Sequence, residues 1–193
     1  MKRLFIAGEL DEGSAEQLES QIQRFRTTFA REAEAVRWVA RERYHLTLVF
    51  LGDTEERQIP GVREIVRQCA FPGIPELRIG PPIVFPRPSS PRVLARSVGA
   101  GAEELGKLAS RLRGSLEERQ LRFDSKPFTA HITAGYLKRG ERSRLRQVAT
   151  LWVGATDLGE ITGAVSRITL FESSIDSRGP RYIPLESIEG SRR

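Results

Sequence analysis

The stretch HLTLVFL at residues 45–51 gives the clearest indication of the fold. Its apolar and β-branched residues predict a strand. Successive side chains of a strand point to opposite faces, so His45 and Thr47 share one face while Leu46 turns to the core. The chain contains two histidines, and the second opens a similar stretch, His131-Ile132-Thr133-Ala134. Two strands that present the same pair of side chains provide the frame on which the other elements can be placed.

The segments around the two histidines follow a similar order. Hydrophobic periodicity, turn residues and a capping-box pattern at Ser14 and Gln17 predict strands and helices that recur in both halves of the chain. The expected strands are 4–8, 36–39, 45–51, 77–79, 83–85, 92–98, 131–137, 165–172 and 182–185, and the expected helices are 14–29, 60–69, 103–118 and 141–148. We interpret this repetition as a duplication that gives two similar lobes within a single domain spanning residues 1–193.

Length and composition indicate a globular protein that binds polyanions. The 193 residues are 39% apolar, which is enough for one domain with a sizeable core. No apolar run is long enough to cross a bilayer, and no signal-like segment opens the sequence, so we expect a cytoplasmic protein without membrane contact. The single Cys69 excludes an internal disulfide. Lys and Arg outnumber Asp and Glu by 31 to 25, and the resulting net charge of +6 favours partners such as nucleic acid.

The two His-x-Thr pairs point to acid–base chemistry at phosphorus. With ten threonines in 193 residues, the chance that both histidines are followed in this way by accident is about one in 370. Two imidazoles on facing lobes can flank a phosphorus atom for an in-line displacement, one as base and the other as acid. The hydroxyls of Thr47 and Thr133 can donate hydrogen bonds to the phosphate oxygens. Neither histidine has a convincing third metal ligand nearby, so we expect no metal and no other cofactor.

In combination, these motifs resemble the two-histidine phosphoesterases, and among them the bacterial and archaeal RNA 2′,3′-cyclic phosphodiesterases, which are also described as 2′-5′ RNA ligases. The resemblance covers nearly the whole chain, at residues 3–7, 36–39, 45–52, 91–94, 126–128 and 173–182 and at the second histidine motif. It implies an α+β, bilobal fold in which two antiparallel sheets face a central cleft with helices on the outside. It also implies metal-independent hydrolysis of a terminal cyclic phosphate to a 2′-phosphate.

The sequence departs from the family pattern at two positions. The family usually has proline before the second histidine, where this chain has Ala130, and arginine five residues after it, where this chain has Tyr136. An arginine can bind phosphate through two hydrogen bonds, whereas Tyr136 can donate one or stack on a base. We therefore expect Tyr136, Lys138 and Arg139 to contribute to substrate binding, with one of the two cations supplying the missing charge.

Three interpretations of the function stay open at this point. The main one is a cyclic phosphodiesterase acting on RNA ends, tRNA fragments among them, as a monomer. Ligation of a 5′-hydroxyl end would be the same reaction run in reverse, because the chain has no nucleotide-binding loop for an ATP-driven reaction. The alternatives are an RNA-end binding module with weakened catalysis and a phosphodiesterase for small cyclic nucleotides.

Overall fold

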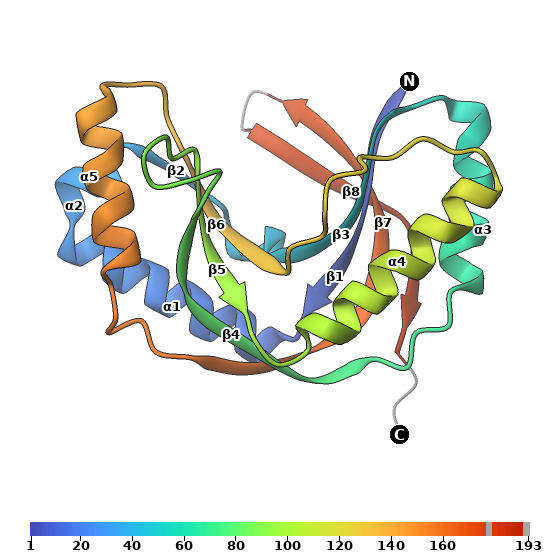
Figure 1. The fold of residues 1–193 in the computed structure, drawn as a ribbon, viewed down its shortest axis with the longest axis horizontal. Helices are drawn as coiled ribbons and strands as arrows, with labels where there is room; N and C mark the ends of the chain where they lie inside the picture. The colour runs from blue at the N-terminus through green and yellow to red at the C-terminus, as the bar shows by residue number, and fades with distance from the viewer. Residues whose placement is uncertain (177–178, 191–193) are drawn as a thin grey trace.

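The computed structural model describes residues 1–176 and 179–190, so positions 177–178 of the expected motif at 173–182 lie outside the described residues. Within these ranges, helices are interspersed among the strands along the chain (Figure 1). In order they are β1 (Lys2–Leu10), α1 (Glu12–Thr28), α2 (Ala30–Ala33), β2 (Val36–Trp38), β3 (His45–Thr54), α3 (Ile59–Gln68), β4 (Ile74–Phe85), β5 (Val93–Val98), α4 (Ala102–Glu118), β6 (His131–Leu137), α5 (Arg142–Val153), β7 (Ile161–Asp176) and β8 (Gly179–Glu189). Short 3₁₀ turns at Arg41–Arg43 and Glu56–Gln58 precede β3 and α3.

The strands form an antiparallel, open sheet with the order β2-β6-β5-β4-β7-β1-β3. The last strand, β8, pairs with residues 167–176 of β7. Figure 1 shows this sheet bent into a U, with β2, β6, β5 and β4 in one arm and β1, β3, β7 and β8 in the other. The α+β class and the antiparallel arrangement are confirmed. The two expected sheets are joined in one path, because β4 pairs with β7 between residues 74–79 and 161–165.

The helices lie outside the U. In Figure 1, α1, α2 and α5 flank the arm that contains β6, and α3 and α4 flank the arm that contains β3. The helix that follows β5 is α4, yet it packs against β3 in the opposite arm, and α5 packs against β4. Each arm is therefore assembled from both halves of the sequence, so neither arm corresponds to one continuous half of the chain.

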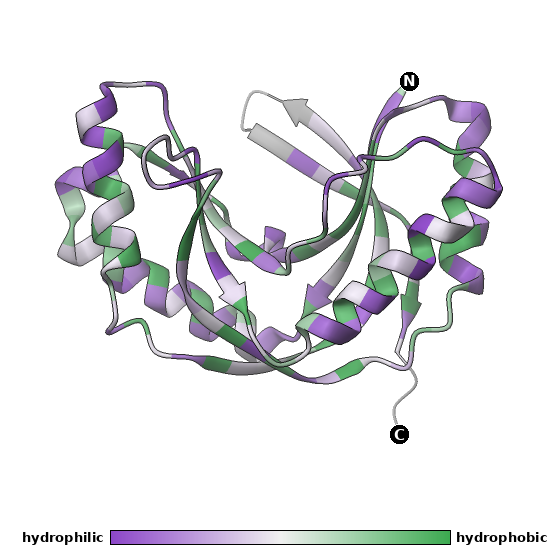
Figure 2. Ribbon diagram, viewed as in Figure 1, coloured by the Kyte–Doolittle hydropathy of each residue, from purple (hydrophilic) through white to green (hydrophobic). Residues whose placement is uncertain are grey.

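Apolar residues at helical spacing explain why these helices cover the sheet. In α4 the expected leucine stripe is confirmed as core, and its four members are fully buried: Leu105, Leu108, Leu112 and Leu116. Apolar residues alternate with polar ones along α4 and occupy much of the sheet in Figure 2. Burying each such side chain contributes about 1.5 to 3 kcal/mol, so this packing stabilises the contact between α4 and the sheet.

The start of α1 differs from the prediction. The N-cap is Asp11, three residues before Ser14, because its carboxylate accepts hydrogen bonds from the Ser14 backbone N–H at 2.9 Å and from the Ser14 hydroxyl at 2.8 Å.

The expected strands at 77–79 and 83–85 are one strand, β4, with a register shift between Ile79 and Pro82. The prolines therefore interrupt the pairing without ending the strand.

A fully buried arginine connects β5 to its neighbouring elements. Arg96 on β5 is 0% exposed, and its guanidinium donates to the carbonyls of Gly80 at 2.6 Å and Gly159 at 2.8 Å and to the side chain of Gln21. Burial lowers the pKa of Arg96 to about 10. These bonds tie β5 to β4, to α1 and to the loop before β7, a connection that the sequence pattern did not reveal.

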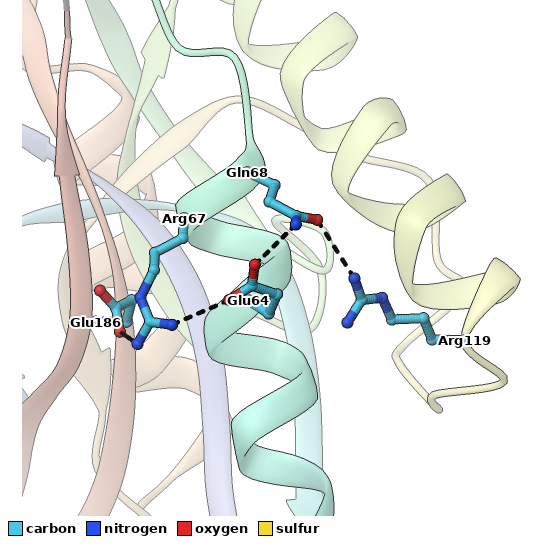
Figure 3. A network of polar contacts seen from close by, with 5 residues as sticks. All are labelled: Glu64, Arg67, Gln68, Arg119 and Glu186. Atoms are coloured by element: carbon cyan, nitrogen blue, oxygen red, sulfur yellow. Dashed lines mark hydrogen bonds and ion pairs between the residues drawn. The ribbon is translucent and has the colours of Figure 1, made fainter.

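A polar network fastens the outer helices of the arm that contains β3 (Figure 3). Arg67 on α3 forms ion pairs with Glu186 on β8 at 2.7 Å and with Glu64 at 3.0 Å. Gln68 connects Glu64 to Arg119, which lies at the end of α4. These contacts join the outer helices to each other and to β8.

Candidate functional site

The two histidine strands meet at the bottom of the U. His45 is the first residue of β3 and His131 is the first residue of β6. The two strands are in contact, and the backbone N–H of Asp124, in the segment before β6, donates to the carbonyl of Phe50 on β3 at 2.7 Å. The fold thus brings together two motifs that are 86 residues apart in the sequence.

A β-bulge follows the His-x-Thr pair on β3. His45 pairs with Glu9 and Thr47 with Ala7, and the register then shifts, so that Phe50 pairs with Phe5. An extra residue in one strand reverses the alternation of the side chains beyond it. The side chains of His45, Thr47 and Phe50 therefore lie on one face.

The same device appears on β6. His131 pairs with Ser97 and Thr133 with Ala95, and the register shifts before Tyr136. The bulge turns Tyr136 to the face of His131 and Thr133, although simple alternation would have placed it on the core face with Ile132. Each arm therefore presents a histidine, a threonine two residues later and an aromatic residue five residues later.

Both imidazoles are held in the same way by the backbone. The Nδ1 atom of His45 lies 2.7 Å from the carbonyl oxygen of Arg43, and that of His131 lies 2.7 Å from the carbonyl oxygen of Thr129. A carbonyl can only accept, so each Nδ1 carries a proton and donates it. Each ring consequently keeps Nε2 for chemistry.

Aromatic rings set the surroundings of both imidazoles. The ring of His45 lies 5.1 Å from that of Phe5 and 5.4 Å, edge-on, from that of Tyr182, measured between centroids. The ring of His131 lies 4.7 Å from that of Phe85. His45 also has a polar neighbour, since its Nε2 lies 3.1 Å from the Thr47 hydroxyl. The neutral imidazole accepts a hydrogen bond from this hydroxyl.

The electrostatic environment favours a neutral His45. Burial lowers the pKa of His45 below its ordinary value, the hydrogen bond to the Arg43 carbonyl partly opposes this effect, and the charge of His131 lowers the pKa further. Burial also raises the pKa of Tyr182, which keeps that phenol neutral beside the histidine.

A cavity of about 410 Å³ extends from His45 along the inner face of both arms. Cations, aromatic rings and hydroxyl groups line it, and no carboxylate of the described residues does. The lining residues are Arg3, Phe5, Arg37, His45, Thr47, Phe50, Tyr136, Ser173 and Tyr182. A cavity with this lining suits an anionic ligand that contains a planar ring. His131 and Thr133 share the face of Tyr136 and are half-buried, but they are not among the residues that line this cavity.

The three residues expected to bind substrate do not all lie at the cavity. Tyr136 lines the cavity, whereas Lys138 and Arg139 do not. Strand β6 ends at Leu137, and the Lys138 ammonium group donates to the backbone carbonyl of Glu34 at 2.7 Å. The cations that do line the cavity, Arg3 and Arg37, were not singled out from the sequence, because the bulges and the pairing of β2 with β6 bring them there.

The described ranges contain no group of three or more His, Cys, Asp or Glu side chains arranged to hold a metal ion. None of the helices in these ranges has the length and apolar character needed to span a bilayer.

An open antiparallel sheet with two inward-facing His-x-Thr pairs defines a two-histidine phosphoesterase arrangement, and the chain belongs to the 2′-5′ RNA ligase superfamily, whose family model matches residues 14–176. Among curated proteins, the RNA 2′,3′-cyclic phosphodiesterase of Aquifex aeolicus is 31% identical over 152 residues, which cover 78% of this chain and 79% of that protein.

Solved structures show the same fold. The structure of TT0787 from Thermus thermophilus matches with a TM-score of 0.73 at 26% identity and covers 98% of both chains. The structure of LigT from E. coli complexed with 3′-AMP matches with a TM-score of 0.72 at 27% identity and covers 99% of both chains. The family expected from the sequence is confirmed by these comparisons.

Proposed function

We propose that this protein hydrolyses the 2′,3′-cyclic phosphate at an RNA end to a 2′-phosphate, with His45 as the general base and His131 as the general acid. The general activity, that of an RNA 2′,3′-cyclic phosphodiesterase, follows from the curated relatives and from membership of the superfamily. The observation that carries the mechanism is the matched pair of imidazoles, each with Nδ1 bonded to a backbone carbonyl and Nε2 left for the reaction.

The role of the base follows from the environment of His45, and His131 takes the remaining role of the acid. His45 has a lowered pKa and is neutral near pH 7, so its Nε2 can accept a proton from the attacking water. The water oxygen then forms a bond to phosphorus while the bond from phosphorus to the 3′ oxygen breaks. His131, in its protonated form, donates a proton to that leaving oxygen. The products are a 2′-phosphate and a free 3′-hydroxyl.

The threonines stabilise the charge that develops on the phosphate. In the free protein the Thr47 hydroxyl donates to His45 Nε2, and on substrate binding it turns to a non-bridging oxygen. Thr133 lies at the matching position of β6 and serves the opposite side. Hydrogen bonds that strengthen as negative charge develops lower the barrier without any metal ion.

The remaining proposals concern the RNA that is hydrolysed, the oligomeric state and the cellular location. A net charge of +6 favours RNA, and we propose that tRNA fragments are among the RNA ends that are hydrolysed. Because both histidine motifs come from one chain, we also propose that the protein acts as a monomer. We propose the cytoplasm as its location. Light scattering at micromolar concentration tests the monomer, and a dimer whose dissociation abolishes turnover would contradict it.

A direct experiment follows the opening of a 5′-labelled oligonucleotide that ends in a 2′,3′-cyclic phosphate. The variants His45→Ala and His131→Ala should each lose all measurable turnover and keep the far-ultraviolet circular dichroism spectrum of the wild type. Arg24→Ala, on the exposed face of α1, is the matched control and should have full activity. Turnover in either histidine variant would refute the paired mechanism.

A further inference from the structure

Two arginine–aromatic pairs lie on the cavity wall, one in each arm. The guanidinium carbon of Arg3 is 4.9 Å from the centre of the Phe50 ring, and that of Arg37 is 5.2 Å from the centre of the Tyr136 ring. Phe50 and Tyr136 occupy the same place in their strands, five residues after a histidine and just beyond a bulge. The cavity therefore has two similar walls, each made of a cation stacked on a ring.

Neither arginine is committed to a structural ion pair. Within the described ranges no carboxylate lies within ion-pair distance of Arg3 or Arg37, whereas Arg67 and Arg167 are paired with glutamates. Both cavity arginines are exposed at its rim. A guanidinium that lies over a ring keeps its edge N–H groups for hydrogen bonds, so these cations are oriented for a planar or anionic ligand.

Strand β2 holds Arg37 in this place. Arg37 pairs directly with Tyr136 across the β2–β6 ladder, so both side chains lie on the same face. Gly135 lets the two strands approach closely, because a β-carbon at this position would lie 2.5 Å from a methyl group of Val36. The Arg37–Tyr136 pair is thus built into the sheet.

The distance from the histidines decides which part of a substrate these pairs can reach. Phe50 and Tyr136 follow Thr47 and Thr133 by three residues, which is roughly 10 Å of strand at 3.3 Å per residue. The reacting phosphorus must lie near the imidazoles and the threonine hydroxyls. The two pairs therefore face the portion of the substrate that adjoins the cyclic phosphate.

We propose that Arg3–Phe50 and Arg37–Tyr136 form a binding site for the terminal nucleotide, in which the rings stack on its base and the guanidinium groups bind the phosphodiester on its 5′ side. This inference rests on the proposed function. Stacking and backbone charge are the usual means of holding single-stranded RNA. The ligand class is an RNA end with at least one 5′ phosphodiester, in preference to an isolated nucleoside cyclic phosphate.

The test compares two substrates that differ by one phosphodiester. These are a nucleoside 2′,3′-cyclic phosphate and a dinucleotide that ends in the same group. For Arg3→Gln and Arg37→Gln, we expect KM for the dinucleotide to rise about 10-fold, with kcat and the mononucleotide KM changed less than about 2-fold. Arg24→Gln, which removes the same charge from the exposed face of α1, should leave both substrates unchanged.

Salt dependence and stacking provide two further readouts. The slope of log kcat/KM against log salt should become shallower by about 0.7 for each cavity arginine removed. Tyr136→Leu should raise KM for both substrates, and Tyr136→Phe should resemble the wild type because it keeps the ring. The same loss on both substrates in the arginine variants, or an equal loss in Arg24→Gln, would overturn the assignment.

A binding experiment separates this inference from the proposed function. In His45→Ala, the affinity for a labelled dinucleotide with a 2′-phosphate should fall when Arg37→Gln is added. If the wild type shows no turnover but this binding still depends on Arg37, the proposed reaction is wrong and the nucleotide site is retained. If turnover occurs and neither binding nor KM responds to the arginines, the nucleotide site is wrong and the reaction is retained.

Discussion

The hydroxyl group of Thr47 offers a sharp test of the mechanism, because Thr47→Val removes it and preserves the shape of the side chain. Its hydrogen bond to His45 Nε2 is 3.1 Å long, and both residues line the cavity, so a water molecule can replace the hydroxyl. The free energy of unfolding should therefore change by less than about 1.5 kcal/mol. Removing one donor to a developing charge costs about 2.7 to 4 kcal/mol in the transition state, which is about 100- to 1,000-fold in kcat. Because Thr47 is half-buried, we expect the lower end of this range, with KM nearly unchanged.

The assay follows the opening of a cyclic-phosphate oligonucleotide by chromatography, with a thermal melt to verify folding. Thr47→Ser keeps the hydroxyl and should retain activity within about 10-fold of the wild type. Thr133→Val should lose activity to a similar degree, because Thr133 has the matching position on β6. Full activity in Thr47→Val, or an equally large loss in Thr47→Ser, would refute a role for this hydroxyl in binding the developing charge.

Four further predictions concern the pH profile, the pH dependence of stability, the buried Arg96 and strand packing. Since the pKa of His45 is lowered, the acidic limb of the pH profile of kcat/KM should lie below pH 6.5, and a limb above it would contradict the environment described for His45. The unfolded chain binds a proton at His45 more readily than the folded protein does. The stability due to this group is therefore complete above about pH 6.5 and decreases as pH falls through the folded pKa. In thermal melts, His45→Gln should lose less stability between pH 7.5 and 5 than the wild type. Arg96→Met should lower the free energy of unfolding by about 2 to 4 kcal/mol in urea titrations because it leaves buried carbonyls without donors, and KM should not change. Gly135→Ala should destabilise the protein by about 1 to 3 kcal/mol and raise the oligonucleotide KM by displacing β2, whereas Gly114→Ala, whose β-carbon would enter open space, should not.

The sequence allowed most of the strands and helices to be predicted, because the apolar periodicity of segments such as α4 and β6 is strong. It also identified both histidines and both threonines as candidates, since the repeated spacing is visible without any coordinates. Their catalytic and phosphate-binding roles stay predictions that the variants above will test.

Features that depend on pairing between distant strands could not be predicted. The bulges that turn Phe50 and Tyr136 into the cavity depend on the register of β1 with β3 and of β5 with β6. Arg37 reaches the cavity only because β2 pairs with a strand about 100 residues later. For the same reason the sequence pointed to Lys138 and Arg139, which are near Tyr136 in sequence, and did not point to Arg37.

The buried Arg96 and the exchange of helices between the arms have a similar explanation. An arginine in a strand pattern is usually exposed, and the carbonyls that accept from Arg96 belong to the neighbouring strand β4 and to the loop before β7, 63 residues later in the sequence. Helix α4 covers the arm opposite to the strand that precedes it, which local periodicity does not encode. Periodicity predicts that a face is buried and does not specify its partner.

The most direct test of the central claim is a ³¹P NMR time course of an oligonucleotide 2′,3′-cyclic phosphate, incubated with the protein in excess EDTA. The paired-histidine mechanism predicts complete conversion to the 2′-phosphate resonance at a rate that added Mg²⁺ or Zn²⁺ does not increase. A cyclic-phosphate signal that persists until a divalent metal is added, or a product that resonates as a 3′-phosphate, would contradict it.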